Sequence, residues 1–459
     1  MGLLDVLDAR LGDGLENLLC AHHARRLRGL GWGDVLDGDG AGWFTPRRTV
    51  QHGNKMEILV DGALAFPVVA EAIERAQKYV HIANWHASPD FRLTREPGAP
   101  QLRELLSSAA ERVPVRVLLW AGPPVPFFEP TRKRAEAARR DFLESGAIRC
   151  ELDARERTLH CHHEKIVIVD DVAFVGGLDM TAVEGDRHDS PEHPPRDLGW
   201  HDHVARLEGP VVAEVAGHFA ARWSEIAGET LPAPVVPPEA GSSSVQMVRT
   251  IPERTYGFAP HGDFTLLDSY LRALRSAESL VYLENQFLWS PEITEVLLAK
   301  LCEPPSPEFR MVLLLPQKPS NGADTTRGQL GRLFAADHDD RLVAATLVAH
   351  GDAPVYVHAK LSIVDDRWLS VGSANLNEHS LFNDTEVNVV TDDAEVARST
   401  RLRLWTEHLG TDVSGPAHEV VDEVWRPALE RPARVTSLPG VSRRAGRLQG
   451  PLRGLLVDG

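Results

Sequence analysis

One residue pattern occurs twice in this chain, and the duplication limits the folds that the chain can adopt. The pattern is a histidine, one residue, a lysine, four residues and an aspartate. It is formed by His163, Lys165 and Asp170 in the first half, and by His358, Lys360 and Asp365 in the second half. A short apolar run rich in β-branched residues follows each lysine and predicts a buried strand. A unit repeated at this separation indicates two halves of similar fold rather than a short solenoid repeat.

Each motif also leads into a turn that contains glycine. Gly177 stands two residues before Asp179 in the first half, and Ser373 stands two residues before Asn375 in the second half. A further glycine precedes both turns. Such turns allow the backbone to approach an anion closely, so both are candidates for binding or orienting a phosphate.

Strands alternate with helices in both halves, which favours an α/β fold with mixed α and β structure. We therefore expect two duplicated α-β-α layered halves. The predicted strands cover residues 56–60, 79–83, 115–120, 166–169, 245–249, 280–283 and 311–315. The predicted helices cover residues 66–77, 102–112, 132–145, 211–226, 264–276, 292–301 and 394–409.

Composition places the boundaries of these units. Residues 1–50 are expected to form a helical lead-in, whose leucine face packs on the body of the protein. The first half then covers residues 51–227, and the second half covers residues 245–425. The Pro/Ser-rich stretch 228–244 between them has the composition of a linker. The basic Pro/Gly-rich tail, residues 426–459, is expected to be extended or partly disordered.

Charge and cysteine content exclude several classes of protein. The formal net charge is −17 at pH 7, which works against nonspecific nucleic-acid binding. The four cysteines are scattered, without the paired spacing of a zinc ribbon or a disulfide framework. The start of the chain lacks the pattern of a signal peptide, and no apolar run is long enough to span a bilayer. We expect a cytoplasmic protein that is a monomer and binds no nucleic acid.

Two histidines, two lysines and nearby carboxylates suggest acid–base or nucleophilic chemistry on an anionic substrate. One imidazole can attack an electrophile while the other protonates the leaving group. The lysines would neutralise the charge that develops on the non-bridging oxygens. A phosphodiester is the natural substrate, because both the bond that forms and the bond that breaks then have a partner.

A metal site and a cofactor are not expected. Four further histidines raise the question of a metal cluster, namely His160, His162, His201 and His203. However, His160 and His162 would share the strand face opposite His163. No carboxylate pattern near them in the sequence completes a set of ligands.

The chain resembles the phospholipase D superfamily in both motifs and in the blocks around them. Six flanking blocks carry the resemblance, at residues 85–89, 200–202, 207–210, 219–223, 282–287 and 407–410. They are more similar to phospholipases D of the eukaryotic type than to the short nucleases of the superfamily. Two features depart from that pattern. Residues 1–50 are too short for an upstream lipid-targeting domain, and Glu378-His379 stands where an arginine is common.

The resemblance implies that the halves pack about a pseudo-twofold axis, so that both motif histidines meet at one phosphate. His163 would form a covalent phosphohistidine, and His358 would protonate the departing alcohol. Further roles fall to Lys165, Lys360 and Asn375 on the phosphoryl oxygens, and to Asp202 and Glu386 in orienting the histidines. Asp179 would contact phosphate only if it is itself hydrogen-bonded. Asp170 and Asp365, which complete the catalytic motifs, would hold the fold of each motif.

The expected function is a phospholipase D-type phosphodiesterase that acts on glycerophospholipids at a membrane surface. Water or an alcohol would resolve the phosphohistidine, giving hydrolysis or transphosphatidylation. A phosphatidyltransferase similar to cardiolipin synthase is the alternative, and a nuclease is a third. From a different class, the chain could be an inactive interaction module, against which the intact histidines and lysines of both halves argue.

Overall fold

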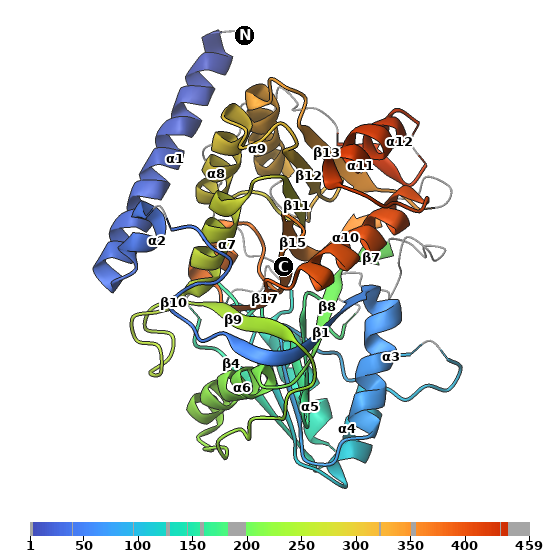
Figure 1. Cartoon of the computed structure of the whole chain (residues 1–459). Helices are drawn as coiled ribbons and strands as arrows, with labels where there is room; N and C mark the ends of the chain where they lie inside the picture. The colour runs from blue at the N-terminus through green and yellow to red at the C-terminus, as the bar shows by residue number, and fades with distance from the viewer. Residues whose placement is uncertain are drawn as a thin grey trace.

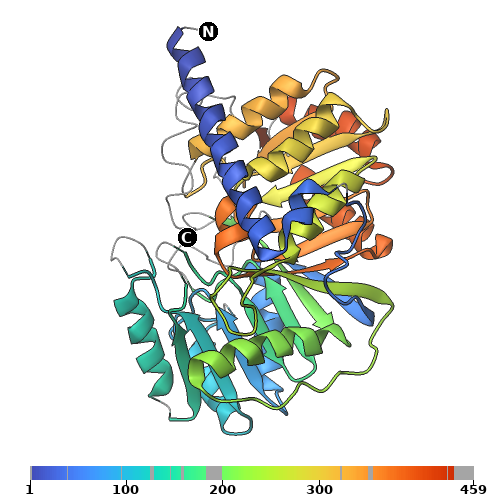
Figure 2. The same ribbon diagram turned by 90° about the vertical axis from the view of Figure 1, so that its left-hand side faces the viewer.

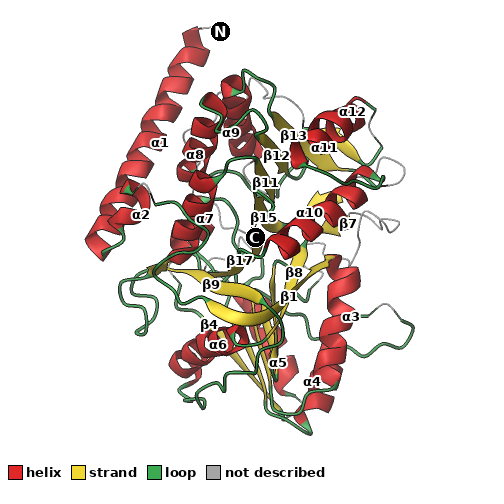
Figure 3. Ribbon diagram, viewed as in Figure 1, coloured by secondary structure: helices red, strands yellow, loops and turns green. Residues whose placement is uncertain are grey.

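The computed structural model describes residues 3–38, 40–94, 96–124, 129–144, 146–156, 160–181, 199–320, 323–349, 355–431 and 433–438. A mixed sheet of 16 strands runs through the molecule, and helices flank it (Figures 1 and 3). The first half of the chain builds the lower part of the molecule in Figure 1, and the second half builds the upper part. The predicted α/β class is confirmed.

Both halves arrange their strands in the same spatial order. In the first half the order is β1 (Gln51–Val60), β8 (His203–Glu208), β6 (Val172–Gly176), β5 (Ile166–Val169), β2 (Val80–Asn84), β3 (Val115–Trp120) and β4 (Ile148–Asp153). In the second half it is β9 (Ser243–Ile251), β17 (Glu386–Thr391), β16 (Trp368–Gly372), β15 (Lys360–Val364), β11 (Leu280–Asn285), β12 (Arg310–Leu314) and β13 (Leu342–Leu347).

The hydrogen-bonding directions also repeat. In each half the first four neighbouring strand pairs of that order are antiparallel, and the last two pairs are parallel. The halves join where β1 pairs antiparallel with β9, its counterpart in the other half. Two equal units joined antiparallel through equivalent strands are related by an approximate twofold axis. The expected duplication about a pseudo-twofold is therefore confirmed.

The described residues form three large hydrophobic cores, and the central one belongs to both halves. It combines inward-facing residues of β6 and β8 with those of β15, β16 and β17. Helices α6 (Val211–Ala227) and α10 (Ala394–Leu409), one from each half, complete it. The motif strand Ile166–Val169 is buried on both faces, since alternate residues belong to the central core and to an outer core. This explains why the strand is apolar at every position.

Each half has its own outer core beneath a layer of helices. In the first half the helices are α3 (Asp61–Glu74), α4 (Leu102–Ala110) and α5 (Arg132–Leu143). In the second half they are α7 (Thr265–Ser276), α8 (Pro291–Cys302) and α9 (Ala323–Ala336). Because helices cover the outer faces and the two halves cover each other's inner faces, little sheet surface is left to water.

The N-terminal segment forms a long helix, α1 (Leu3–Leu30), and a short one, α2 (Gly33–Asp37). Figure 2 shows α1 lying across the helices of the second half. Arg26 forms an ion pair of 2.6 Å with Glu253, and His23 stacks on Phe382 with ring centroids 3.9 Å apart. The segment therefore packs on the second half rather than standing apart from the body.

The first residues of the tail, which was predicted to be extended or partly disordered over residues 426–459, are ordered instead. Residues 426–430 form a helix, α12 (Arg426–Glu430), and β18 (Val435–Ser437) pairs antiparallel with β13. Val435 is buried in the central core. The open edge of β13 supplies the hydrogen bonds that order this segment, and composition alone does not reveal that edge. Residues 439–459 lie outside the described residues. Several elements were also missing from the prediction, namely the strands β4, β6, β8, β13, β16 and β17 and the helix α9.

The two motif aspartates lie at the far end of their strands and hold a turn. The Asp170 carboxylate accepts the backbone N–H groups of Gln77, Lys78 and Tyr79 at 2.6–3.1 Å. Asp365 accepts three backbone N–H groups in the same way, from residues 278–280. Both aspartates have a positive φ, 54° and 55°, which aspartate tolerates better than most residues. Each carboxylate thus fixes the chain that enters the neighbouring strand, β2 or β11.

We expect Asp170→Ala to lower the free energy of unfolding by about 2–4 kcal/mol, because three backbone donors lose a charged acceptor. Asp170→Asn keeps one acceptor oxygen and should lose less. Asp171→Ala is the matched control, since its ion pair with Lys78 is solvent-exposed and should contribute under about 0.5 kcal/mol. Denaturant unfolding measures all three variants. Equal stability of Asp170→Ala and Asp171→Ala would refute the structural role.

Candidate active site

The main chain brings each motif histidine into contact with the opposite half. β14 (Val355–Val357) pairs parallel with β7 (Gly199–His201), and the His358 N–H donates to the His201 carbonyl at 2.9 Å. On the other side, the His163 N–H donates to the Thr385 carbonyl at 3.0 Å. The two hydrogen bonds are equivalent under the pseudo-twofold, because each runs from a motif histidine of one half to a main-chain carbonyl of the other half. They place both motifs at the seam between the halves.

The histidine side chains are oriented by carboxylates that also cross this seam. The Nδ1 atom of His163 lies 3.0 Å from Glu386 Oε1 and 3.0 Å from the Ser373 carbonyl oxygen. The Nδ1 atom of His358 lies 2.6 Å from Asp202 Oδ2. Each half therefore supplies a histidine to the site and the carboxylate that holds the other half's histidine. The predicted partners Asp202 and Glu386 occupy these positions.

These contacts define the tautomers. Both atoms next to His163 Nδ1 are acceptors, so Nδ1 carries the proton and Nε2 carries the lone pair. The carboxylate beside His358 gives the same tautomer in the neutral ring. An imidazole held through Nδ1 in this way can use Nε2 to attack phosphorus or to transfer a proton.

The residues predicted to bind or orient phosphate in the glycine turns lie behind the carboxylates. The Ser373 hydroxyl donates to Glu386, and the Ser380 hydroxyl donates to the same carboxylate at 2.5 Å. At the equivalent position in the first half, a Cβ atom on Gly177 would lie 2.3 Å from both carboxylate oxygens of Asp202. Gly177 is thus required for Asp202 to reach His358, and Ser373 positions Glu386.

The two lysines stand beside the histidines but have different partners. Lys165 Nζ lies 3.3 Å from Asp179 Oδ2 and donates to the His163 carbonyl at 2.8 Å. Lys360 Nζ donates to Gln286 Oε1 at 3.0 Å and to the His358 carbonyl. Each ammonium is thereby tied to the backbone of its own motif histidine.

Asp179 and Asn375, which occupy equivalent positions, complete this asymmetry. The Asp179 carboxylate accepts the His86 backbone N–H at 3.2 Å in addition to its ion pair with Lys165. The Asn375 amide donates to Gln286 Oε1 at 3.3 Å. The acid of the first half is therefore hydrogen-bonded and balances Lys165, whereas the equivalent residue of the second half is a neutral amide.

Burial dominates the electrostatics of the site. It raises the pKa of Asp202 to about 7, and the nearby Lys360 and a backbone N–H offset only part of this effect. Burial also raises the pKa of Glu386 well above its usual value. The pKa of His358 lies well below its usual value because of burial, with Lys360, Lys165 and His163 adding to the effect. The charges of both halves therefore act on one another in a shared, poorly hydrated site.

A buried ionic network supports Asp202 from behind, and no sequence pattern indicated that its members contact one another. His201 bridges Asp61 at 2.9 Å and Glu284 at 2.8 Å, and Glu284 also accepts from His408 at 2.9 Å. The Asp202 backbone N–H donates to Asp61 Oδ1 at 3.0 Å. Burial alone would lower the pKa of His201, but Asp61 and Glu284 raise it well above its usual value. Protonated His201 therefore ties the two halves together.

A signal for this network was present in the sequence. Glu284 and Gln286 belong to the block 282–287, and His201 and His408 belong to two other blocks that carry the resemblance. Asp61 gave no such signal, because it lies at the start of a helix and its partner is 140 residues away. Asp170 and Asp365, named with the catalytic motifs, do not face the histidines. Their carboxylates cap the turns at the far strand ends.

Comparison with known families agrees with this geometry. The family described as "Phospholipase D" matches residues 72–199, and the family described as "Cardiolipin synthase, PLD-like domain" matches residues 270–405. The matches fall one in each half and include both motifs. The chain therefore belongs to the phospholipase D superfamily, a superfamily of phosphodiesterases and phosphatidyltransferases.

Several relatives of this chain are named phospholipase D. Phospholipase D A of Dictyostelium discoideum is 24% identical over 82% of this chain and 37% of its own length. Phospholipase D alpha 1 of Ricinus communis is 24% identical over 74% of this chain and 63% of its own length. Phospholipase D2 of Bos taurus is 25% identical over 74% of this chain and 49% of its own length. The chain thus spans between about a third and two thirds of the length of these relatives.

A solved structure shares the fold. The phosphatidylserine synthase of Haemophilus influenzae Rd KW20 superposes with a TM-score of 0.56, covering 80% of this chain and 87% of the other, at 13% sequence identity. Among the helices that the structure describes, none combines the length and apolar character that crossing a bilayer requires.

The raised pKa of Asp202 predicts how stability changes with pH. In the unfolded chain an aspartate ionises near pH 4, whereas folded Asp202 ionises at about 7, so the folded protein loses stability as pH rises between these values. The amide that replaces the carboxyl in the Asp202→Asn variant cannot ionise. The melting temperature of the variant relative to the wild type should therefore rise from about pH 4.5 to pH 7 and then level off.

The size of this effect is on the order of 2–4 kcal/mol across the window. Asp171→Asn serves as the control for the loss of one carboxylate, since the Asp171 side chain is solvent-exposed. Thermal unfolding at a series of pH values measures both variants. A difference for Asp202→Asn that does not depend on pH would contradict the buried, shifted carboxyl.

Proposed function

We propose that this protein is a phospholipase D-type phosphodiesterase, which cleaves glycerophospholipids through a phosphohistidine on His163. The observation that carries the proposal is the exchange of partners across the seam, in which Glu386 holds His163 and Asp202 holds His358. Two imidazoles held through Nδ1 in one site give a phosphodiester both a nucleophile and a proton donor. Hydrolysis and transfer to an alcohol both fit this arrangement.

The first step uses the Nε2 lone pair of His163. Nε2 attacks phosphorus and forms an N–P bond, while the P–O bond to the headgroup alcohol breaks. The proton for the departing oxygen comes from His358 Nε2. Burial is the main cause of the low resting pKa of His358, and two nearby lysines lower it further. A bound phosphate anion offsets those lysines and raises the affinity of His358 for the proton that it must donate.

The second step reverses these roles. Water or an alcohol loses a proton to His358 as it attacks phosphorus, and the N–P bond to His163 breaks. Lys165, Lys360 and Asn375 are the groups that we assign to the phosphoryl oxygens in both steps. Asp179 keeps Lys165 extended toward the site, while the neutral amide of Asn375 adds a donor without adding negative charge.

A phosphatidyltransferase is the second candidate, because the family that matches residues 270–405 is described by cardiolipin synthase. The chemistry of the first step is the same in both cases, and only the acceptor differs. We further propose contact with a membrane surface, which presents the lipid substrate, and no binding of nucleic acid, which the net charge of −17 disfavours. We propose a cytoplasmic monomer.

The deciding experiment is incubation with mixed phospholipid vesicles and ethanol, with the products analysed by mass spectrometry. Phosphatidylethanol is the expected product, because an activated phosphatidyl group passes to the alcohol. His163→Asn should lower turnover by at least about 10⁴-fold, since Asn cannot form the covalent intermediate. His52→Gln is the control, because His52 is an exposed histidine bonded only to Ser244 among the described residues.

The other outcomes separate the alternatives. Release of diglyceride would contradict attack at the phosphate with departure of the headgroup. Cardiolipin formed from phosphatidylglycerol vesicles without ethanol would identify the transferase. Cleavage of plasmid DNA at low salt, lost in His163→Asn, would identify a nuclease. Full activity of His163→Asn would overturn the proposed mechanism.

A further inference from the structure

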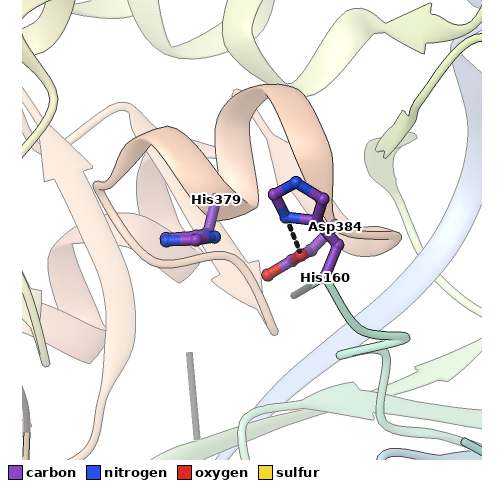
Figure 4. A group of neighbouring side chains, drawn as sticks. All are labelled: His160, His379 and Asp384. Carbon is purple, nitrogen blue, oxygen red and sulfur yellow. Dashed lines mark ion pairs between the residues drawn. The ribbon is translucent and has the colours of Figure 1, made fainter. Parts of the chain in front are cut away.

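A second cluster of ionisable side chains lies at the same seam, outside the reacting groups. It consists of His160 from the first half and His379 and Asp384 from the second half (Figure 4). His379 begins the π-helix η1 (His379–Asn383), and Asp384 follows directly after it. One donor atom from each residue can be chosen so that all lie within 4.8 Å of one another. In Figure 4 the His379 ring lies to the left of the Asp384 carboxylate, and the His160 ring lies above it.

His379 is the unusual member of this cluster. Its side chain is buried, with only 1% of the residue surface exposed. Among the described residues, neither of its ring nitrogens has a hydrogen-bond partner. A buried imidazole normally satisfies at least one nitrogen, because desolvation without a partner costs free energy. The His379 ring without a hydrogen-bond partner, next to the Asp384 carboxylate, therefore suggests that a ligand binds here.

Asp384 has the fixed orientation of a metal ligand. Its Oδ1 accepts the Cys161 backbone N–H at 3.0 Å, and its Oδ2 accepts the Cys161 thiol at 3.5 Å. His160 Nδ1 forms an ion-pair contact of 3.3 Å with Asp384 Oδ1. Hydrogen bonds that hold the ligating carboxylate are a regular feature of metal sites. The His160 side chain is 18% exposed, which gives an ion a path from solvent.

We propose that His160, His379 and Asp384 bind a divalent transition-metal ion, with Zn²⁺ as the best match. Two imidazoles and one carboxylate with a water in the fourth position form a common zinc ligand set. Zinc–ligand bonds of about 2.0–2.1 Å require the donors to approach by small side-chain rotations. The ion would join the segment before β5 to η1 and so fasten the two halves together.

The three other groups of histidines and carboxylates among the described residues do not show the same features. One of them, Asp61, His201 and Glu407, contains the Asp61–His201 ion pair described above. In the group of Asp153, Glu156 and His162, the cation Arg222 already lies 3.1 Å from Asp153. In the group of His201, His203 and Glu284, the carboxylate is already shared between His201 and His408. A guanidinium repels a metal ion, and a carboxylate engaged by two histidines has little capacity left for one. Around His379 the Asp384 carboxylate is engaged by Cys161 and by His160, which is itself one of the three proposed ligands, and no arginine pairs with it among the described residues.

The test measures Zn²⁺ bound to the whole chain after removal of free metal, by elemental analysis. We expect one Zn²⁺ per wild-type chain. At a free Zn²⁺ concentration about 100 times Kd, the melting temperature should rise by about 3 °C. Co²⁺ in place of Zn²⁺ should give the visible absorption bands of a four-coordinate site. His379→Arg, which places a cation in the cluster, should abolish all three signals.

Two further variants make the result unambiguous. His160→Asn changes a partly exposed ligand with little risk to folding, and should lower the affinity for Zn²⁺ at least about 10-fold. His81→Gln is the matched control. His81 is also a buried histidine without a hydrogen-bond partner among the described residues, but it is stacked between Tyr79 and Phe219 and belongs to none of the described groups of candidate metal ligands. Its variant should keep the site.

Either of two results would overturn the proposal. The first is a wild-type chain that binds less than one Zn²⁺ at saturation. The second is Zn²⁺ bound equally well by the wild type, His160→Asn and His379→Arg. The proposal does not depend on the phospholipase activity, because all of its readouts are binding and stability.

Discussion

The rest of the structure depends on one reciprocal contact, the bond from each motif histidine to a carboxylate of the opposite half. Neither half by itself supplies both a motif histidine and the carboxylate that orients it. His163 needs Glu386, and His358 needs Asp202. The twofold arrangement of the sheet, the shared central core and the strand pairs at the seam all serve to bring these four side chains together in a dry environment, where fixed dipoles and charges act strongly.

The seam is polar at the site and apolar around it. Three buried histidines, Asp61 and Glu284 form a network directly behind Asp202, while the central core packs both half-sheets together. Charged groups buried in this way contribute little net stability, but breaking one partner is costly because the other is left unpaired. We infer that the network fixes the relative position of the halves, whereas the core supplies most of the stabilising burial.

The sequence predicted the duplicated α/β fold and eight of the 18 strands that the structure describes, both motif strands among them, because apolar runs and repeated motifs are local signals. It also led to Asp202 and Glu386, but only through resemblance. It could not reveal the exchange of partners, since no periodicity specifies which carboxylate reaches which histidine over more than 150 residues. The cluster of His160 and Asp384 was missed for the same reason. The carboxylate lacking near His160 in the sequence is provided by the opposite half.

The junction of β1 with β9 has a consequence for how this chain could diversify. If the ancestral unit was a single half, two copies would have had to associate through this edge, and both copies would have carried identical side chains. Once both copies are encoded in one chain, each position can change alone. Gly177 corresponds to Ser373, Asp179 corresponds to Asn375, and a shorter acid in one half corresponds to a longer one in the other. Covalent fusion thus permits chemical specialisation of two formerly equivalent histidines, which a symmetric assembly of identical subunits forbids.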